Sequence, residues 1–245
     1  KAFPGRSLVF GILVTGTMQV RARTYPTAPG YFAGPASSET YLQIDAGAAG
    51  FTSDMPAIIF HDFGAGIPPS SRPYAVGVLM VFDTNNPTGL TSLTNPPVLT
   101  TRIGSHVRGS STEGYDKRNL AIEAWTEVNY EDNDVELLGM PADGDWVPYA
   151  PNQFDRNYLH NPMAYGLGRQ MGHYASRTRF AELFFNTGGG VVTYPSFAGG
   201  NYNGIYVIEE KIKVNNDRLD IARLDAQDTN AVTITGGYIM KIDRN

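Results

Sequence analysis

One stretch of the chain, residues 107–123 (VRGSSTEGYDKRNLAIE), combines residue types that can hold a phosphate group. Backbone N–H groups near Gly109 and the hydroxyls of Ser110 and Ser111 could donate hydrogen bonds to phosphate oxygens. Lys117 follows them and would add a positive charge. The spacing is neither that of a Walker loop nor that of a G-x-G-x-x-G loop. A plain β-hairpin with a polar turn fits the same residues, and spacing alone favours that simpler interpretation.

Further sequence blocks follow this turn in a fixed order. They read LLGMPADGDWVPYAP (137–151), FDRNYLHNPMAYGLGRQMG (154–172), YASRTRFAELFFN (174–186), YNGIYVIEEKIKVNNDRLDIARL (202–224) and TGGYIMKIDR (235–244). The ordered set resembles the CotH (spore coat protein H) kinase-like family. The usual forms in that family are RGSS…K, LLGMPADSDW, N-P-x-AY-x-L, YAPRTRFVE, NG-x-YVL-x-EKIK, R-x-DI and GGY-x-K-x-D.

The resemblance implies an atypical protein kinase fold that binds ATP with magnesium and acts on a protein substrate. It also implies a bacterial protein that is secreted or held at the cell surface. Carried over residue by residue, the nucleotide-binding positions are Arg108, Gly109, Ser110, Ser111, Lys117 and Glu210. Within this set, Lys117 is the candidate for contacting phosphate and Glu210 for positioning the nucleotide. For Glu210, an ordinary charged strand end is the competing interpretation.

The chain departs from the family pattern at three points, one of which is DKRNL at 116–120 where the family often has KKSY. The family helix often carries an acidic residue two positions after the alanine of its AY pair, where this chain has Gly166. The family's catalytic and metal-binding aspartates lie after the GGY-x-K-x-D block, and thus beyond Asn245. Phosphoryl transfer needs a base and metal-holding carboxylates. We therefore assign no catalytic residue and no metal ligand, and expect a domain truncated at its C-terminus that is weak or inactive as a kinase unless a C-terminal half completes it.

Two alternative functions remain open on the residues alone. One is a non-catalytic extracellular scaffold that contacts polysaccharide or neighbouring domains. The other is a polysaccharide hydrolase, for which paired carboxylates could be drawn from Asp143, Asp145, Glu209 and Glu210. The letters D-F-G also occur, at 62–64, but they precede every other kinase-like block. We interpret them as a strand end and turn, with Asp62 capping the loop.

Composition narrows the class of protein. The chain has 245 residues, a formal net charge of −5 and no cysteine. A mildly acidic chain lacks the positive surplus that binds nucleic acid, and the lack of cysteine excludes disulfides and zinc-thiolate sites. The apolar run at 8–14 (LVFGILV) is too short to span a membrane and is interpreted as a buried strand.

The predicted fold class is α+β, with an atypical kinase-like lobe built on a mixed or antiparallel sheet. We predict two domains: residues 1–45 as the end of a β-sandwich module, resembling chitobiase C-terminal or fibronectin-III-like modules, and residues 46–245 as the CotH-like domain. Residues 45–54 read as a linker. One helix is expected at 161–172, with Asn161 as N-cap and Gly172 as C-cap. Strands are expected at 17–25, 38–44, 56–60, 76–82, 98–107, 118–125, 179–186, 204–209 and 238–242.

Overall fold

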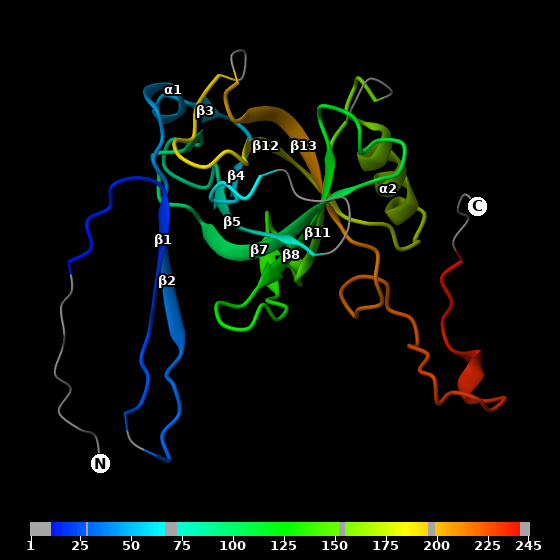
Figure 1. Cartoon of the computed structure of the whole chain (residues 1–245). Coiled ribbons are helices and arrows are strands. Elements are labelled where there is room, and N and C mark those ends of the chain that lie inside the picture. Colours follow the sequence, from blue (N-terminus) through cyan, green and yellow to red (C-terminus); the bar gives the residue numbers. More distant parts are fainter. Residues whose placement is uncertain (1–10, 28, 67–72, 152–154, 196–198, 241–245) are drawn as a thin grey trace.

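The computed structural model describes residues 11–27, 29–66, 73–151, 155–195 and 199–240. In this part of the chain strands dominate and close into a barrel (Figure 1). Neighbouring strands of the barrel follow the order β11-β13-β12-β4-β5-β7-β8, and β8 pairs with β11 to close it. The strands are β4 (Ala57–His61), β5 (Ala75–Phe82), β7 (Leu99–Arg108), β8 (Asn119–Trp125), β11 (Asp145–Tyr149), β12 (Thr178–Asn186) and β13 (Tyr202–Glu210).

All pairings in the barrel are antiparallel except one. Strand β12 runs parallel to β4, with Leu183 opposite Ile58 in the register. Every other pair, from β4–β5 round to β11–β13, is antiparallel. The sheet is therefore mixed and has no open edge, because closure pairs both of its end strands.

Alternating side chains fill the inside of the barrel, as strand geometry requires. All seven barrel strands contribute residues that are almost fully buried there. They pack with two residues of the short β9–β10 pair (Val135–Leu137 and Met140–Asp143). The cluster comprises Ile58, Phe60, Leu79, Val81, Ile103, Ile122, Leu137, Met140, Trp146, Ala150, Ala181, Leu183, Tyr206 and Ile208.

A second apolar cluster covers the outer face of β4, β5 and β12. Helix α1 (Ala46–Ala49) contributes Ala48 to this cluster. Its N-cap is Asp45, whose side chain accepts a hydrogen bond from Ala48 N. The short strands β3 (Thr52–Ser53) and β6 (Thr91–Ser92) pair with each other. The linker prediction for 45–54 was therefore wrong, because small apolar residues such as Ala48 are buried against the barrel.

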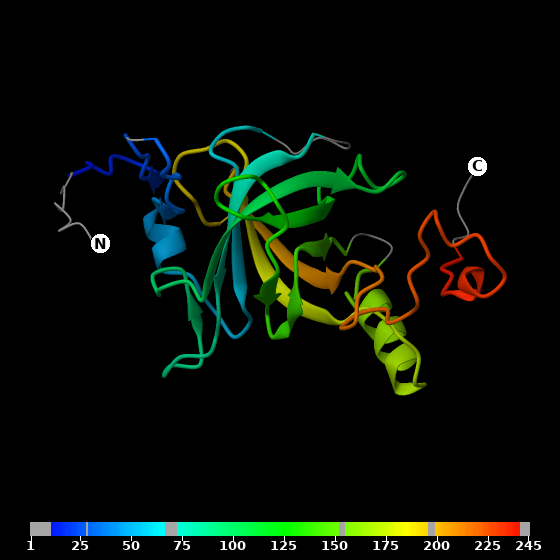
Figure 2. The same ribbon diagram turned by 90° about the horizontal axis from the view of Figure 1, so that it is seen from below.

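The N-terminal part forms a separate hairpin, β1 (Met18–Arg23) with β2 (Ala36–Tyr41). It projects from one side of the barrel, and residues 222–240 extend from the opposite side (Figures 1 and 2). The strands predicted at 17–25 and 38–44 are confirmed in type. The strand predicted at 8–14 was wrong for residues 11–14, which are exposed coil, and residues 8–10 lie outside the described residues. The division at residues 45 and 46 stays a prediction.

Helix α2 (His160–Gln170) is the one long helix of the described part of the chain. Asn161 lies inside it rather than at the N-cap. The helix start is instead capped by the buried carboxylate of Asp155, which accepts hydrogen bonds from Leu159 N (3.1 Å) and His160 N (3.3 Å). Gly172 follows the C-cap with φ +80°, a backbone conformation that suits glycine after a helix end.

The structure corrects the fold class toward mostly β. Seven strands form the barrel, whereas α2 is the one long helix of the described residues, and α1 and the 3-10 turn Thr233–Thr235 add little. Residues 238–240 of the strand predicted at 238–242 are coil, and the other two lie outside the described residues. Among the described residues, no helix is long and apolar enough to span a membrane.

Candidate functional site

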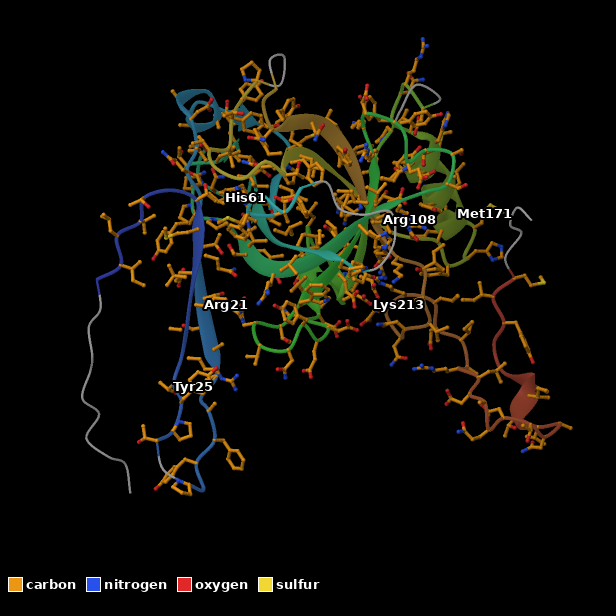
Figure 3. The ribbon with its side chains drawn as sticks, viewed as in Figure 1. Arg21, Tyr25, His61, Arg108, Met171 and Lys213 are labelled. Atoms are coloured by element: carbon orange, nitrogen blue, oxygen red, sulfur yellow. The ribbon has the colours of Figure 1, made fainter. Side chains whose placement is uncertain are left out.

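A cleft of about 320 Å³ lies between helix α2 and the outer face of four barrel strands, β7, β8, β11 and β13. Figure 3 shows Arg108 on the side of the barrel where α2 lies, and His61 on the other side. The volume falls at the lower end of the roughly 300–1,000 Å³ typical of small-molecule sites. The lining residues are Tyr74, His106, Arg108, Ala121, Ile122, Asp145, Val147, Tyr165, Ser176, Glu209, Glu210, Lys211 and Ile212.

Strand register explains which side chains meet in the cleft. His106 pairs with Ala121 across β7 and β8, and Val147 pairs with Glu209 across β11 and β13. Directly opposed residues point to the same face of a sheet. The short Ala121 and Val147 side chains leave the floor low, and Tyr165 of α2 closes one wall.

The cleft collects residues from five of the sequence blocks described above. The RGSS turn contributes Arg108, and the ADGDW block contributes Asp145. The NPMAYGL helix contributes Tyr165, the YASRTRF block contributes Ser176, and the IEEKI block contributes Glu209 and its successors. These blocks are spread over more than 100 positions of the sequence, so their convergence is a property of the fold.

Arg108 is the arginine at the rim of the cleft. It ends β7 and is exposed. Among the described residues, no carboxylate oxygen lies within 4 Å of its guanidinium, although it acts electrostatically on Glu209 and Tyr165. A guanidinium in this situation can bind a phosphate or carboxylate group with two parallel hydrogen bonds.

Glu209 is the carboxylate at the base of the cleft. It is only 6% exposed, and its Oε1 accepts a hydrogen bond from Asn161 Nδ2 at 2.8 Å. Burial raises the pKa of Glu209 to about 7, although the Asn161 hydrogen bond and the charge of Arg108 favour ionisation. A carboxyl with this pKa exchanges its proton near neutral pH.

Lys117 does not line the cleft. Its Nζ donates to the backbone carbonyl of Ile205 and lies 4.9 Å from the ring centre of Tyr158 and 4.7 Å from that of Tyr206. Burial lowers the pKa of Lys117 to about 8. This side chain joins the loop before β8 to β13 and to the segment that precedes α2.

The other residues of the predicted turn are also absent from the cleft wall. Gly109 has φ +121°, and a Cβ built on it would lie 2.3 Å from Thr112 Oγ1, so glycine is needed there. Ser110 and Ser111 follow in the exposed turn. The turn therefore flanks the cleft through Arg108 and leaves both hydroxyls in solvent.

Glu210 has a partner within the protein. Its fully buried carboxylate lies 2.5 Å from Arg177 Nη1 and also accepts a hydrogen bond from Arg177 N at 2.8 Å. These contacts fit the alternative interpretation of Glu210 as an ordinary charged residue at a strand end.

A network of charges joins two of the sequence blocks, 137–151 and 202–224, beside the cleft. Lys213 Nζ lies 2.7 Å from Asp143 Oδ1 and 2.8 Å from Asp145 Oδ2. Arg218, whose side chain is nearly fully buried, reaches Asp143 and also donates to the Asp145 carbonyl. Burial works against ionisation of Asp145, but hydrogen bonds from Lys211 and Lys213 hold its pKa below the ordinary value. These contacts give Asp143 and Asp145 cationic partners inside the protein.

The D-F-G letters form a turn, as predicted. Asp62 Oδ1 accepts a hydrogen bond from Gly64 N at 2.9 Å, and Phe63 and Gly64 both have positive φ. The turn follows β4 on the far side of the barrel from Arg108 (Figure 3). Asp62 is absent from the residues that line the cleft.

Sequence reasoning missed Asn161, Tyr165 and Asp155 as site residues. Asn161 was expected to cap α2 but orients Glu209, and Asp155 caps the helix in its place. The N-P-x-AY block held the available signal, because both Asn161 and Tyr165 belong to it. Within the described residues no group of three His, Cys, Asp or Glu side chains is placed to hold a metal ion.

Comparison with known proteins gives one match. A family model described as CotH kinase protein matches residues 106–245, which begin in β7 and include every block that lines the cleft. No curated protein and no solved structure matches the chain.

Proposed function

Because the chain belongs to the CotH kinase family, we propose that residues 106–245 form the nucleotide-binding part of a CotH-type protein kinase and that the cleft beside α2 is its nucleotide site. One observation carries the proposal: five separate sequence blocks of the family-matched region converge on this single cleft. In this proposal the barrel takes the place of the kinase lobe that covers the nucleotide.

Arg108 is the residue assigned to the nucleotide phosphates. Lys117, Lys211, Lys213, Arg177 and Arg218 all contact groups of the protein itself. Arg108 faces the cleft, and among the described residues it has no carboxylate within 4 Å. The proposal therefore moves the phosphate contact from Lys117 to Arg108 and gives Lys117 the task of fixing the turn that follows Arg108.

Magnesium fits this cleft only together with the nucleotide. Mg²⁺ keeps several waters and is commonly held by one or two carboxylates plus substrate phosphates. The described residues assemble no three-ligand site, so the nucleotide phosphates would have to supply most of the ligands of the ion other than water. The resemblance places the family aspartates after the GGY-x-K-x-D block, which is residues 236–243 of this chain. Phosphoryl transfer to a protein substrate is therefore proposed only together with a segment that supplies those aspartates.

A scaffold function at an extracellular or cell surface is the second candidate. It is favoured by the β1–β2 hairpin, whose connection exposes Tyr25 (72%), Tyr31 (64%) and Phe32 (95%). Exposed aromatic rings of this kind suit contact with a neighbouring domain or a polysaccharide. The hydrolase alternative has less support, because Asp143, Asp145 and Glu210 all lie in ion pairs.

The experiment that tests nucleotide binding is a calorimetric titration of ATP with magnesium into the chain and into Arg108→Ala. Loss of a charge-assisted contact to phosphate should weaken binding about tenfold or more. Arg223→Ala is the matched control, because the Arg223 side chain is 81% exposed and lies outside the cleft. Lys117→Ala should have a smaller effect than Arg108→Ala. Equal affinities for the wild type and Arg108→Ala would contradict the proposal.

A further inference from the structure

Glu209 presents a hydrogen-bond acceptor to the cleft. The side chain is more than nine-tenths buried, and Asn161 occupies only its Oε1. Among the described residues no group donates a hydrogen bond to Oε2. Glu209 is one of the residues that line the cleft, so a molecule bound there can reach its carboxylate.

A half-satisfied buried carboxyl is costly unless something completes its hydrogen bonds. Water can do so in the free protein, and a bound molecule can do so in its place. The molecule must offer a neutral donor, a hydroxyl or an amino group, since its anionic part is drawn to Arg108. Arg108 and Glu209 belong to different strands, β7 and β13, and line the same cleft.

We propose that Glu209, oriented by Asn161, determines nucleotide specificity by accepting a hydrogen bond from a hydroxyl or amino group of the nucleotide whose phosphates Arg108 binds. This inference rests on the proposed function. Two parts of a nucleotide offer such a donor, the ribose diol and the amino group of the base. Asn161 is a positioning residue, because its amide holds Oε1 and so fixes the orientation of the carboxylate.

Sites that bind a hydroxyl or amino group reject analogues that lack it, because the buried acceptor is then left unpaired. The wild type should therefore bind ATP about tenfold or more tightly than one analogue in a set of 2′-deoxyATP, 3′-deoxyATP and inosine triphosphate. Discrimination against a deoxy form identifies the ribose as the donor. Discrimination against inosine triphosphate identifies the amino group of the base.

The deciding variant is Glu209→Gln, tested with the same four nucleotides by calorimetry at pH 8. In this variant the amide oxygen can stay with Asn161 while the amide nitrogen faces the cleft, so a donor replaces the acceptor. The four nucleotides should then bind within about threefold of one another. Glu136→Gln is the control, since Glu136 is an exposed residue of β9 outside this cleft.

A second variant covers the case in which Glu209→Gln fails to fold, and thermal unfolding is measured first for both. Asn161→Ala keeps the carboxylate but removes its orienting hydrogen bond, so discrimination should fall more than ATP affinity does. Discrimination unchanged in both variants, or absent in the wild type, overturns the role of Glu209 while Arg108→Ala still reports on nucleotide binding. A wild type that binds no nucleotide overturns both proposals.

Discussion

Glu209 and Glu210 are consecutive residues of β13 whose carboxylates have opposite surroundings. Glu210 Oε1 lies 2.5 Å from Arg177 Nη1, so a cation neutralises its charge. Glu209 Oε1 lies 2.8 Å from the neutral Asn161 amide, and burial raises the pKa of Glu209 to about 7. Successive strand residues point to opposite faces, which lets one strand carry a structural ion pair and a titratable cleft residue side by side.

The first prediction concerns pH and Glu209. The ordinary carboxyl value is 4.5, so between about pH 4.5 and pH 7 the folded state holds more protons than the unfolded chain. Stability therefore falls as pH rises through this window. Glu209→Gln lacks this loss. Its free energy of unfolding, relative to that of the wild type, should therefore rise by on the order of 2–3 kcal/mol between pH 5 and pH 8. Urea unfolding at both pH values measures it, and parallel pH profiles for the two proteins would refute it.

The second prediction concerns the buried charges beside the cleft. Asp143→Asn leaves Lys213 and the buried Arg218 without their shared carboxylate. Removing one partner of a buried ion pair typically costs about 3–5 kcal/mol. Asp225→Asn removes the partner of the exposed Arg223 and should cost less than about 1 kcal/mol. Similar unfolding midpoints for the two variants in urea would show that Asp143 is not a structural charge.

The third prediction contrasts two glycines. A Cβ built on Gly166 of α2 would meet no atom within 4 Å, so Gly166→Ala should stabilise the protein by about 0.5–1 kcal/mol. A Cβ on Gly104 would lie 2.1 Å from the Trp125 ring, so Gly104→Ala should destabilise it by about 1–3 kcal/mol. Thermal unfolding of both variants checks the opposite signs. The open space also means that an acidic residue at 166, as in the family pattern, can be introduced without a clash.

The fourth prediction concerns Lys117. Its folded pKa of about 8 lies below the ordinary 10.5, so the unfolded chain holds more protons between these values. Stability then rises as pH increases from about 8 toward 10.5, and the cost of burying the charge is fully present below pH 8. The free energy of unfolding of the wild type, relative to that of Lys117→Met, should rise by on the order of 1–2 kcal/mol between pH 7.5 and pH 10. This value allows for solvent screening, because Lys117 is partly exposed. Chemical denaturation at both pH values measures the gap, and a gap independent of pH would refute the prediction.

Local sequence patterns predicted the elements better than their assembly. Alternation and apolar runs located the barrel strands β4, β5, β7, β8, β12 and β13 within a few residues, and helical spacing located α2. They missed β11, whose letters DWVPY include a proline that argues against a strand. Closure of the barrel depends on the pairing of β12 with β4. These strands are far apart in the sequence, so no local sequence pattern predicts that they pair.

The candidate site was predicted in part for the same reason. Resemblance pointed to the RGSS turn and hence to Arg108, which does line the cleft. It also pointed to Lys117 and Glu210, whose side chains contact protein groups through tertiary neighbours such as Tyr206 and Arg177. Met163, Leu167 and Met171 recur every fourth residue, which is a helical spacing, yet all three are exposed, the first two on α2 and Met171 at its C-cap. Spacing reveals a helix, whereas burial depends on what packs against it.

The parallel pairing of β4 with β12 also bears on how the chain folds as it is synthesised. Residues 57–61 pair with residues 182–186, more than 100 positions later, so this edge of β4 stays unpaired until that part of the chain has been made. Until then β4 and its partner β5 form an apolar hairpin with one open edge, the kind of edge that recruits other chains. Contacts between such distant residues slow folding. We therefore expect yield during expression to depend on chaperones and growth temperature more than the stability of the finished barrel would suggest.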